Sequence, residues 1–402
     1  MAAGAATVVP RRERAPWVEA VVGQGLALVV AFAIAVAIGS LIVVLYGESP
    51  VAVYGAMLRF AFKDPTSVGT VLSIATPLIF SALAVAVCFK AGLFNIGVEG
   101  QFLVGMVTAS WAALALDFLP GFTHMLAVLL FAILGGMVYA AIPAVLKVTT
   151  GAHEVVTTIM LNGIALSIVS YALNGPLKYT KAPPGQNVDL RTDIFEPSAL
   201  VPKIGAAFGV GESANLSLLL PVALVAAGIV WFMVRRMRLG YEARAVGSSA
   251  GSARAGGIAI GAVQIKLFLI SGALAGLTGM QQVLVERGAL VQNYESQLGF
   301  TGIAVAFLGQ NNPIGIVFAA ILWGILSRGE TALQIETEVP REFVIILQSI
   351  LILTVVVVYQ IAKRRLARRQ LQRAGEVEGG LRDTVAPTDA DRPEPPERLS
   401  EV

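Results

Sequence analysis

The chain has 402 residues, of which 56% are hydrophobic and 14% charged, whereas soluble domains average roughly 45–50% and 25%. So little polar sequence excludes a sizeable water-soluble catalytic domain, and a net charge of +3 gives no sign of nucleic-acid binding. The single cysteine, Cys88, excludes an intramolecular disulfide framework, and its apolar surroundings predict a packing role.

Long stretches without Asp, Glu, Lys or Arg indicate an all-α polytopic membrane protein. A bilayer core about 30 Å thick needs roughly 20 apolar residues of helix, and only helices or closed barrels satisfy every backbone group in lipid. Barrel strands would be about ten residues long and alternating, whereas these runs are longer and continuously apolar. The clearest runs are Ala20–Gly47, Pro65–Phe89, Val155–Leu177, Ser213–Val234, Leu267–Val285 and Phe343–Ala362.

The first half of the chain predicts five spans. Arg11, Arg12 and Arg14 precede the first span, which favours a cytoplasmic N-terminus. This span runs to Tyr46, and the polar stretch 48–64 is expected outside. The next four spans are expected at about 67–89, 102–116, 125–146 and 155–173, with Lys90 and Lys147 at inner ends.

A polar segment, 174–214, follows and is expected outside, where Pro183, Pro184 and Gly185 disfavour regular helix. The sixth span is expected at 215–234. The interval from there to Lys266 holds six basic residues and one acidic residue, as a cytoplasmic loop should.

A seventh span is expected at 267–285, where Gly272 and Gly276 form a small-xxx-small pattern typical of a helix-packing face. The uncharged stretch 296–327 predicts two segments joined by a tight inner turn. The turn is expected at Gln310, Asn311, Asn312 and Pro313.

The interval 328–342 is expected outside, and the last span, 343–362, meets a basic cluster that favours an inside end. A topology of ten transmembrane segments, some of them broken or short, places both termini inside. It accounts for the position of every charge cluster. The chain then divides into a cytoplasmic arm (1–17), a membrane domain (18–362) and a basic, then acidic and proline-rich tail (363–402) that is expected to be disordered from about residue 375.

The segment KAGLFNIGVEGQ, residues 90–101, is the first candidate for a functional site. Its glycines weaken any helix, and Asn95 and Glu99 would share a face if the segment were helical. A carboxylate at membrane depth usually faces a cavity or a partner, and broken helices commonly form substrate sites in transporters. The alternative is an ordinary cytoplasmic turn with solvated polar residues, and the sequence leaves both interpretations open.

A weak echo in the second half hints at a two-fold internal pseudo-repeat. Glu99 and Gln101 precede an apolar segment, and so do Glu295 and Gln297. Internally repeated halves are common in transporters.

The inner loop, residues 235–266, alternates small residues with Arg244 and Arg254, which suits a short helix that docks against another protein. The alternative is a basic loop that only sets orientation. The sequence contains no Gly-x4-Gly-Lys-Ser/Thr phosphate loop, and its two histidines, His124 and His153, have no cysteine pair to complete a zinc site. No catalytic, metal or cofactor residue is expected.

Two motifs, AGLFNIGVEGQ (91–101) and EVVTTIMLN (154–162), resemble permease subunits of bacterial ABC importers of the branched-chain amino acid and simple-sugar class. The likeness is greatest to the nucleoside permeases of that class. EARAVGSSAGSARAGGI (242–258) resembles the family's cytoplasmic coupling loop, and GQNNPIG (309–315) also fits. Ser248-Ser249 and 255–258 depart from the family's usual coupling-loop pattern. The resemblance covers roughly residues 20–362.

The resemblance implies a permease in the bacterial inner (plasma) membrane that imports a nucleoside and performs no chemistry itself. Separate cytoplasmic ATPase subunits would grip the coupling loop, a second and different permease chain would complete the pore, and an external binding lipoprotein would dock on residues 174–214. The coupling residues would be Glu242, Arg244, Gly247, Arg254 and Gly257. The residues lining the path would be Asn95, Glu99, Gln101 and Asn162.

Three alternatives remain open from the sequence. The cargo of the importer could be a simple sugar or a branched-chain amino acid. An ion-coupled secondary transporter working alone would need several intramembrane ionisable groups, of which this chain has few. A membrane-embedded enzyme would need a nucleophile or metal cluster that the sequence does not contain.

Overall fold

The computed structural model describes residues 16–180, 190–292, 294, 297–337, 339–340, 342–358 and 361. The chain divides into two compact units, one formed by residues 37–352 and the other by residues 1–36 with 353–402. All contacts discussed below lie within the first unit. Regular structure in the described residues is helical, and β-structure there consists of two isolated bridges, Arg191 with Val291 and Lys203 with Ser217.

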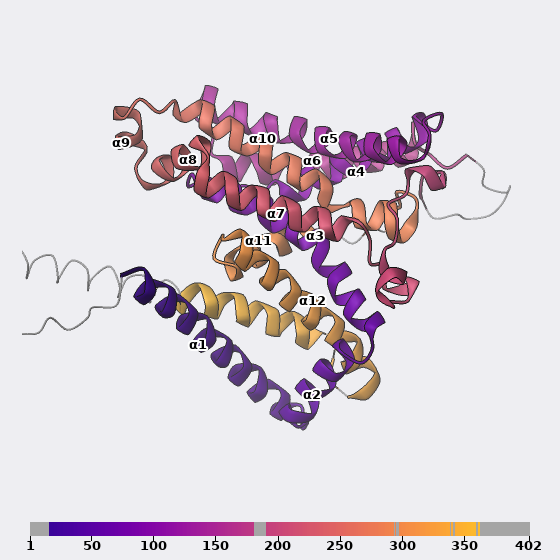
Figure 1. Ribbon diagram of the computed structural model, residues 1–402, viewed down its shortest axis with the longest axis vertical. Coiled ribbons are helices and arrows are strands. Elements are labelled where there is room, and N and C mark those ends of the chain that lie inside the picture. Colours follow the sequence, from indigo (N-terminus) through magenta and orange to yellow (C-terminus); the bar gives the residue numbers. More distant parts are fainter. Residues whose placement is uncertain are drawn as a thin grey trace, which may run out of the picture. The chain divides into compact units, whose positions relative to one another are not determined.

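Twelve α-helices carry labels in Figure 1's numbering: α1 (Pro16–Leu45), α2 (Pro50–Ala61), α3 (Pro65–Phe89), α4 (Val98–Ala115), α5 (Gly121–Thr150), α6 (Glu154–Asn174), α7 (Leu219–Arg236), α8 (Arg238–Ser248), α9 (Ala250–Ala255), α10 (Ile260–Thr278), α11 (Leu298–Leu308) and α12 (Pro313–Glu336). A π-helical segment, η4 (Gln282–Arg287), follows α10, and a last apolar helix spans Glu342–Val358. Three short 3-10 turns, Pro197–Ala199, Gly205–Phe208 and Glu212–Ala214, lie before α7.

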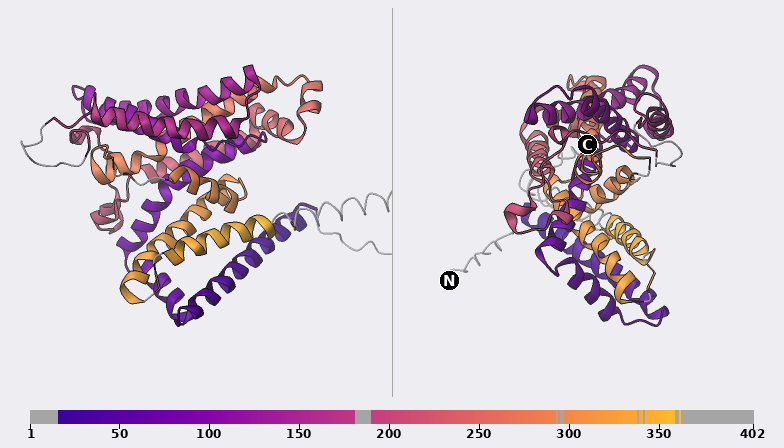
Figure 2. Two further views of the ribbon diagram at one scale, coloured as in Figure 1. Left: turned by 180° about the vertical axis from the view of Figure 1, so that it is seen from behind. Right: turned by 90° about the vertical axis from the view of Figure 1, so that its right-hand side faces the viewer.

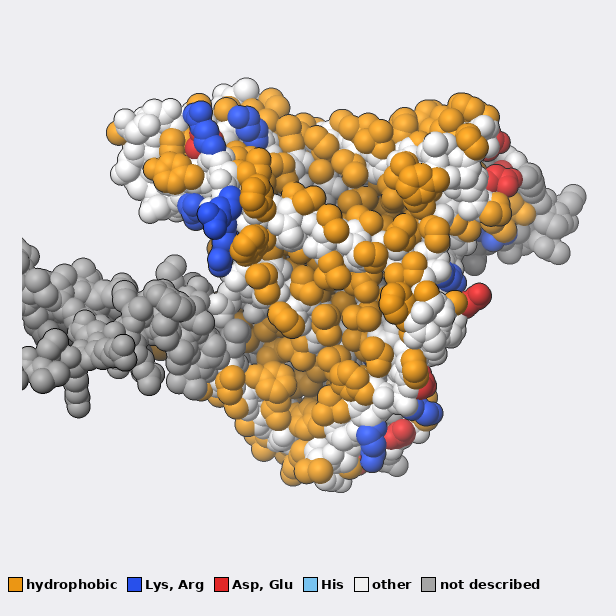
Figure 3. Space-filling model, in the orientation of Figure 1, with side chains coloured by type: hydrophobic (Ala, Val, Ile, Leu, Met, Phe, Trp, Pro, Cys, Tyr) orange, Lys and Arg blue, Asp and Glu red, His pale blue; other side chains and the backbone are white. Residues whose placement is uncertain are grey.

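Within the described residues, seven helices are long and apolar enough to cross a membrane. An eighth span results if α2 and the end of α1, bent by 114°, are counted as one broken span, and α11 and Glu342–Val358 are shorter apolar helices. Figure 3 shows hydrophobic side chains over much of the helix surface; on α6 and α7, for example, Met160 and Ile229 are exposed. The polytopic all-α fold class is confirmed.

Helix ends follow local sequence signals. Asp64 accepts a hydrogen bond from the Ser67 N–H (2.7 Å) and Pro65 occupies the first turn, so α3 begins there. Asn312 caps α12 in the same way before Pro313. The expected tight turn before α12 is confirmed, because Gln310 and Asn311 adopt positive φ.

Two expectations from the sequence were wrong in their boundaries. The stretch 48–64 was expected to be a polar connection, but it contains α2, whose Val53, Ala56 and Met57 are buried at helical spacing. The interval 328–342 was expected to lie beyond the helix, but α12 continues to Glu336 with Ala332 and Leu333 buried. In α2 the one charged residue, Arg59, and at the end of α12 the three charged residues Arg328, Glu330 and Glu336 interrupt the apolar run without ending the helix.

The small-xxx-small pattern in α10 forms a helix-packing face, as expected. A Cβ on Gly272 would lie 2.4 Å from the Gly136 carbonyl oxygen, and one on Gly276 would lie 2.1 Å from that of Ala132, both on α5. α10, α5 and α4 pack together (Figures 1 and 2), and Gly105 of α4 lies against Gly276. The helices therefore meet backbone against backbone.

The segment 174–214, which was expected outside and is called the outer segment below, begins at the last residue of α6. Its described residues 175–180 and 190–214 are irregular apart from short 3-10 turns and the bridge residues Arg191 and Lys203. Pro183, Pro184 and Gly185 lie outside the described residues, as do the N-terminal arm to residue 15, Glu295 of the suggested repeat and the chain beyond residue 361.

Candidate functional site

The segment between α3 and α4, residues 90–97, is not helical. Gly92 adopts a φ of +71°, and the Asn95 Oδ1 accepts a hydrogen bond from the Gly97 N–H (2.9 Å), which forms a local turn. Asn95 therefore precedes α4, and the conditional expectation that it shares a helix face with Glu99 does not hold. The alternative of a solvated turn is also wrong, because Asn95 is 1% exposed and Glu99 6% exposed.

Asn95 and Gln101 form a reciprocal pair of amides. The Asn95 Nδ2 donates to the Gln101 Oε1 (3.1 Å), and the Gln101 Nε2 donates to the Asn95 Oδ1 (3.2 Å). The Asn95 Nδ2 also donates to the Ser271 Oγ on α10 (2.9 Å), and that hydroxyl donates to the Ala84 carbonyl on α3 (2.7 Å). These bonds tie α3, α4 and α10 together in a buried environment where an unpaired polar group would be costly.

Glu99 joins the start of α4 to the start of α11. Its two carboxylate oxygens accept hydrogen bonds from the backbone N–H groups of Gln297 and Gly299, each 2.8 Å long. The helix N-terminus supplies both unsatisfied donors and the positive end of the helix dipole, so the buried charge is compensated. A Cβ on Gly299 would lie 2.4 Å from the Glu99 nitrogen, so this approach requires glycine.

Asn162 of α6 completes the group. Its Oδ1 accepts from the Gly100 N–H (2.8 Å) and its Nδ2 donates to the Ile96 carbonyl (3.1 Å). We use the term polar seam for Asn95, Glu99, Gln101, Asn162 and Ser271. The structure brings the four residues predicted from sequence together, and the hydrogen bonds described above join them to other groups of the protein. Ser271 was missed because only its glycine neighbours stood out in the sequence.

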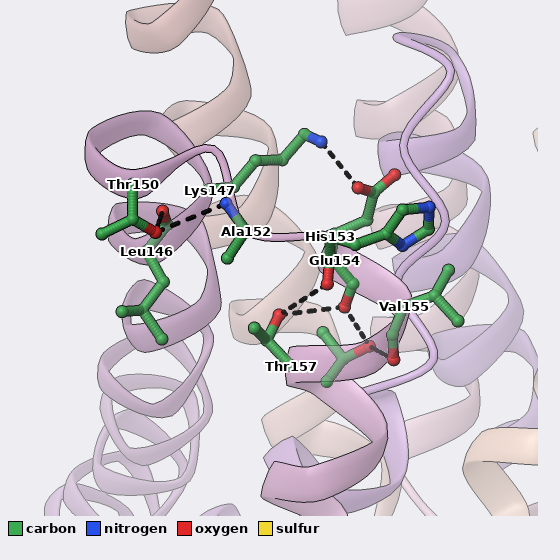
Figure 4. Close-up of polar contacts among 9 residues, drawn as sticks. Leu146, Lys147, Thr150, Ala152, His153, Glu154, Val155 and Thr157 are labelled. Carbon is green, nitrogen blue, oxygen red and sulfur yellow. Dashed lines mark hydrogen bonds and ion pairs between the residues drawn. The ribbon is translucent and has the colours of Figure 1, made fainter.

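A buried ion pair lies at the turn between α5 and α6 (Figure 4). The Lys147 Nζ lies 2.6 Å from the Glu154 Oε2, and both side chains are largely covered. The Thr157 hydroxyl bonds to the carbonyl of His153, and the Phe94 backbone bonds to the Glu154 carboxylate. The ion pair thus holds the segment before α4. Sequence reasoning treated Lys147 only as a topology marker and missed this role.

The expected coupling loop, residues 235–266, contains α8 and α9, and it touches the same segment. Gly247 packs on the backbone of Lys90 and Ala91, where a Cβ would lie 2.4 Å from the Lys90 carbonyl oxygen. Gly92 also lies next to Gly247, because a Cβ added at Gly92 would be 3.7 Å from the Gly247 Cα. The expected coupling residue Gly247 therefore sits one short segment away from the polar seam.

The other coupling-loop residues differ in their surroundings. The Arg244 guanidinium donates to the Val234 carbonyl at the end of α7, and Glu242 pairs with Arg238 at 2.6 Å. Arg254 and Gly257 are exposed at the end of α9.

Positive charge gathers at this end of the unit. Burial, then the charges of Arg244 and Arg235, lower the pKa of Lys90. Figure 3 shows Lys and Arg side chains over the region of α8.

With this geometry established, comparison with known proteins identifies the class. The family model described as the branched-chain amino acid transport system permease component matches residues 67–356. The chain belongs to this family. It is therefore a multi-pass membrane permease, and the family resemblance seen in the sequence is confirmed.

Three relatives match most of this permease. The guanosine ABC transporter permease NupP of Bacillus subtilis is 37% identical over 336 residues, covering 83% of this chain and 93% of NupP. The nucleoside ABC transporter permease NupB of Lactococcus lactis is 31% identical over 80% of this chain and 87% of NupB. The glucose ABC transporter permease TsgB13 of Haloferax volcanii is 31% identical over 79% of this chain and 83% of TsgB13.

Proposed function

We propose that this permease is the membrane-spanning subunit of an ATP-driven importer that carries nucleosides across the bacterial plasma membrane. The observation that carries the proposal is the 37% identity to a guanosine permease over 83% of the chain. A glucose permease of 31% identity and the amino-acid name of the family keep sugars and branched-chain amino acids as alternative cargo.

Separate ATPase subunits would bind the coupling loop, using Glu242, Arg244, Gly247, Arg254 and Gly257. Exposure of Arg244 and Arg254, together with the basic surface around α8, supports a charged protein interface there. The packing of Gly247 on the 90–97 segment gives a route by which movement of α8 would reach the polar seam. We propose, from the basic clusters beside the first and last apolar runs, that both chain termini lie on the cytoplasmic side.

Asn95, Glu99, Gln101 and Asn162 would act along the solute path. Because their hydrogen bonds are already made within the protein, we propose that they set the positions of α4, α6, α10 and α11 around the path. They would then act as positioning residues and not as the surface that touches the solute.

A second permease chain would complete the pore, and an external binding lipoprotein would dock on residues 174–214. The irregular outer segment supports such docking, since its described part carries Asp193 and Glu196 beside a surface cavity of about 440 Å³. The membrane domain would span 18–362, between a cytoplasmic arm and tail.

The test combines binding and uptake. The permease is coexpressed with its candidate ATPase subunits, and copurification and uptake of radiolabelled guanosine are measured. Charge reversal at Arg244 and Arg254 should weaken copurification and uptake together, whereas Arg59→Glu, a reversal at an exposed arginine outside the coupling loop, should leave both intact. Uptake that persists without any ATPase subunit, or after ATP depletion, would instead establish a secondary transporter.

A further inference from the structure

A cavity of about 320 Å³ lies between α3, η4, α11 and α12. Its volume falls within the roughly 300–1,000 Å³ of small-molecule sites. The polar and aromatic residues that line it include Glu286, Thr301, Trp323, Ser327 and Glu330, and none of its described lining residues is Lys, Arg or His.

Two walls of this cavity contain departures from regular α-helix. Pro77 lies inside α3, and η4 is a π-helix that begins at Gln282. Both residues line the cavity. Prolines inside helices and π-helical turns free backbone groups and often mark functional sites in membrane helices.

One wall is held in place by a buried network. The Gln281 Nε2 donates to the Ser73 Oγ (2.7 Å) and to the Asn215 carbonyl (2.8 Å), and the Ser217 hydroxyl donates to the Gln281 Oε1 (2.9 Å). Gln281 and Ser73 are cavity residues, whereas Asn215 and Ser217 lie just before α7. The network therefore fixes the cavity wall to the connection that leads into α7.

The polar seam fixes the opposite wall. Glu99 binds the backbone at the start of α11, and the Ser81 hydroxyl donates to the Leu298 carbonyl there (2.9 Å). Leu298 and Thr301 of α11 line the cavity. Any shift of the segment before α4 would consequently be passed to this wall.

The lining disfavours an anionic solute. Glu286 and Glu330 both line the cavity, and because Glu286 already has an interaction within the protein, Glu330 is the carboxylate that can accept hydrogen bonds from solute hydroxyl groups. A phosphate or carboxylate of the solute would be repelled there, and none of the described lining residues is a cation that could offset it. Charged groups within membrane proteins usually face a water-filled cavity or a substrate pathway. The indole of Trp323 adds an aromatic surface for a flat ring.

We propose that this cavity is a solute-binding site that takes an uncharged molecule joining a planar ring to vicinal hydroxyl groups, as an unphosphorylated nucleoside does. The carboxylate of Glu330 accepts hydrogen bonds from the hydroxyl groups, and Trp323 contacts the ring. The same lining disfavours nucleotides, whose phosphate would meet carboxylates, and a branched-chain amino acid offers neither a planar ring nor vicinal hydroxyl groups. This inference rests on the proposed function, and it identifies the site that would make transport selective for nucleosides.

The test uses cysteine protection in the permease copurified with its ATPase subunits. Cys88 is the only cysteine and is fully buried, so Cys88→Ala gives a clean background. Thr301→Cys and Ser327→Cys then report on the cavity independently, and Ser213→Cys on the outer segment is the control. The rate of modification by a small methanethiosulfonate is measured with guanosine, guanosine monophosphate or leucine.

Guanosine should slow modification of both cavity cysteines in proportion to occupancy, without affecting Ser213→Cys, and the monophosphate and leucine should not protect. When Glu330→Gln is combined with either cavity cysteine, the guanosine concentration that gives half-maximal protection should rise on the order of tenfold, equivalent to about 1.4 kcal/mol. The matched change Glu336→Gln, on the same helix but ion-paired with Arg59 outside the cavity, should not.

The outcomes separate the two proposals. If the wild-type complex imports guanosine but neither cavity cysteine is protected, or if leucine protects as well as guanosine, the cavity inference is overturned and the proposed function stands. If the complex fails to import guanosine, the proposed function fails. Copurification with the ATPase subunits confirms that each variant is folded.

Discussion

Replacing Glu99 with alanine should destabilise the junction between α4 and α11. The side chain is 6% exposed, and it accepts 2.8 Å hydrogen bonds from the backbone N–H groups of Gln297 and Gly299. Alanine would leave both buried donors without their acceptor, at a cost of about 1–3 kcal/mol each. We therefore expect the free energy of unfolding to fall by roughly 2–6 kcal/mol.

Glutamine at position 99 should have an intermediate effect. Its amide keeps one acceptor oxygen but presents an NH₂ group, which cannot accept, to the second backbone N–H. One donor then loses its partner, at about 1–3 kcal/mol. Thermal unfolding of the purified permease measures this ranking: wild type most stable, then Glu99→Gln, then Glu99→Ala.

Glu336→Ala is the matched control for these two variants. Glu336 pairs with Arg59 at 3.8 Å, and both side chains are well exposed, so its removal should cost about 0–1 kcal/mol. If Glu99→Ala unfolds at the wild-type temperature and still loses guanosine uptake, the reasoning from hydrogen bonds is refuted. Glu99 would then serve the passage of solute directly, as the sequence suggested.

Three further predictions concern contacts around the seam. Gly276→Val should destabilise the permease by about 1–3 kcal/mol or more in thermal unfolding, because the side chain meets the α5 backbone. Gly247→Val should lower guanosine uptake, because its side chain would displace the segment before α4; unchanged uptake would contradict this. A double-mutant cycle on Lys147→Gln and Glu154→Gln should give a coupling of roughly 0.5–3 kcal/mol, and additive effects would show that the ion pair contributes nothing.

The fold was predictable where apolar runs are uninterrupted. α3, α5 and α6 match the expected spans within a few residues, because a bilayer demands helices about as long as these apolar runs. α2 and the end of α12 were missed because charged residues interrupt the apolar pattern there while the helix continues. Charge marks the end of an apolar run but does not by itself end a helix.

The sequence predicted which residues belong to the candidate site, but not which residues they hydrogen-bond to. Polar residues near a glycine-rich break marked Asn95, Glu99 and Gln101, and a family motif marked Asn162. Their partners, the start of α11 for Glu99 and Ser271 for Asn95, are about 200 and 176 positions away along the chain. Nothing local in the sequence specifies such distant contacts.

The contact between Gly247 and the backbone of Lys90 and Ala91 has a consequence for how such permeases diverge. Because two main chains touch with no side chain between them, substitutions elsewhere on α8 leave this joint untouched. The exposed side chains Arg244 and Arg254 can therefore be substituted without disturbing this backbone contact. If they bind an ATPase subunit as proposed, relatives could adapt to different ATPase subunits while the packing of α8 on the segment before α4 stays the same.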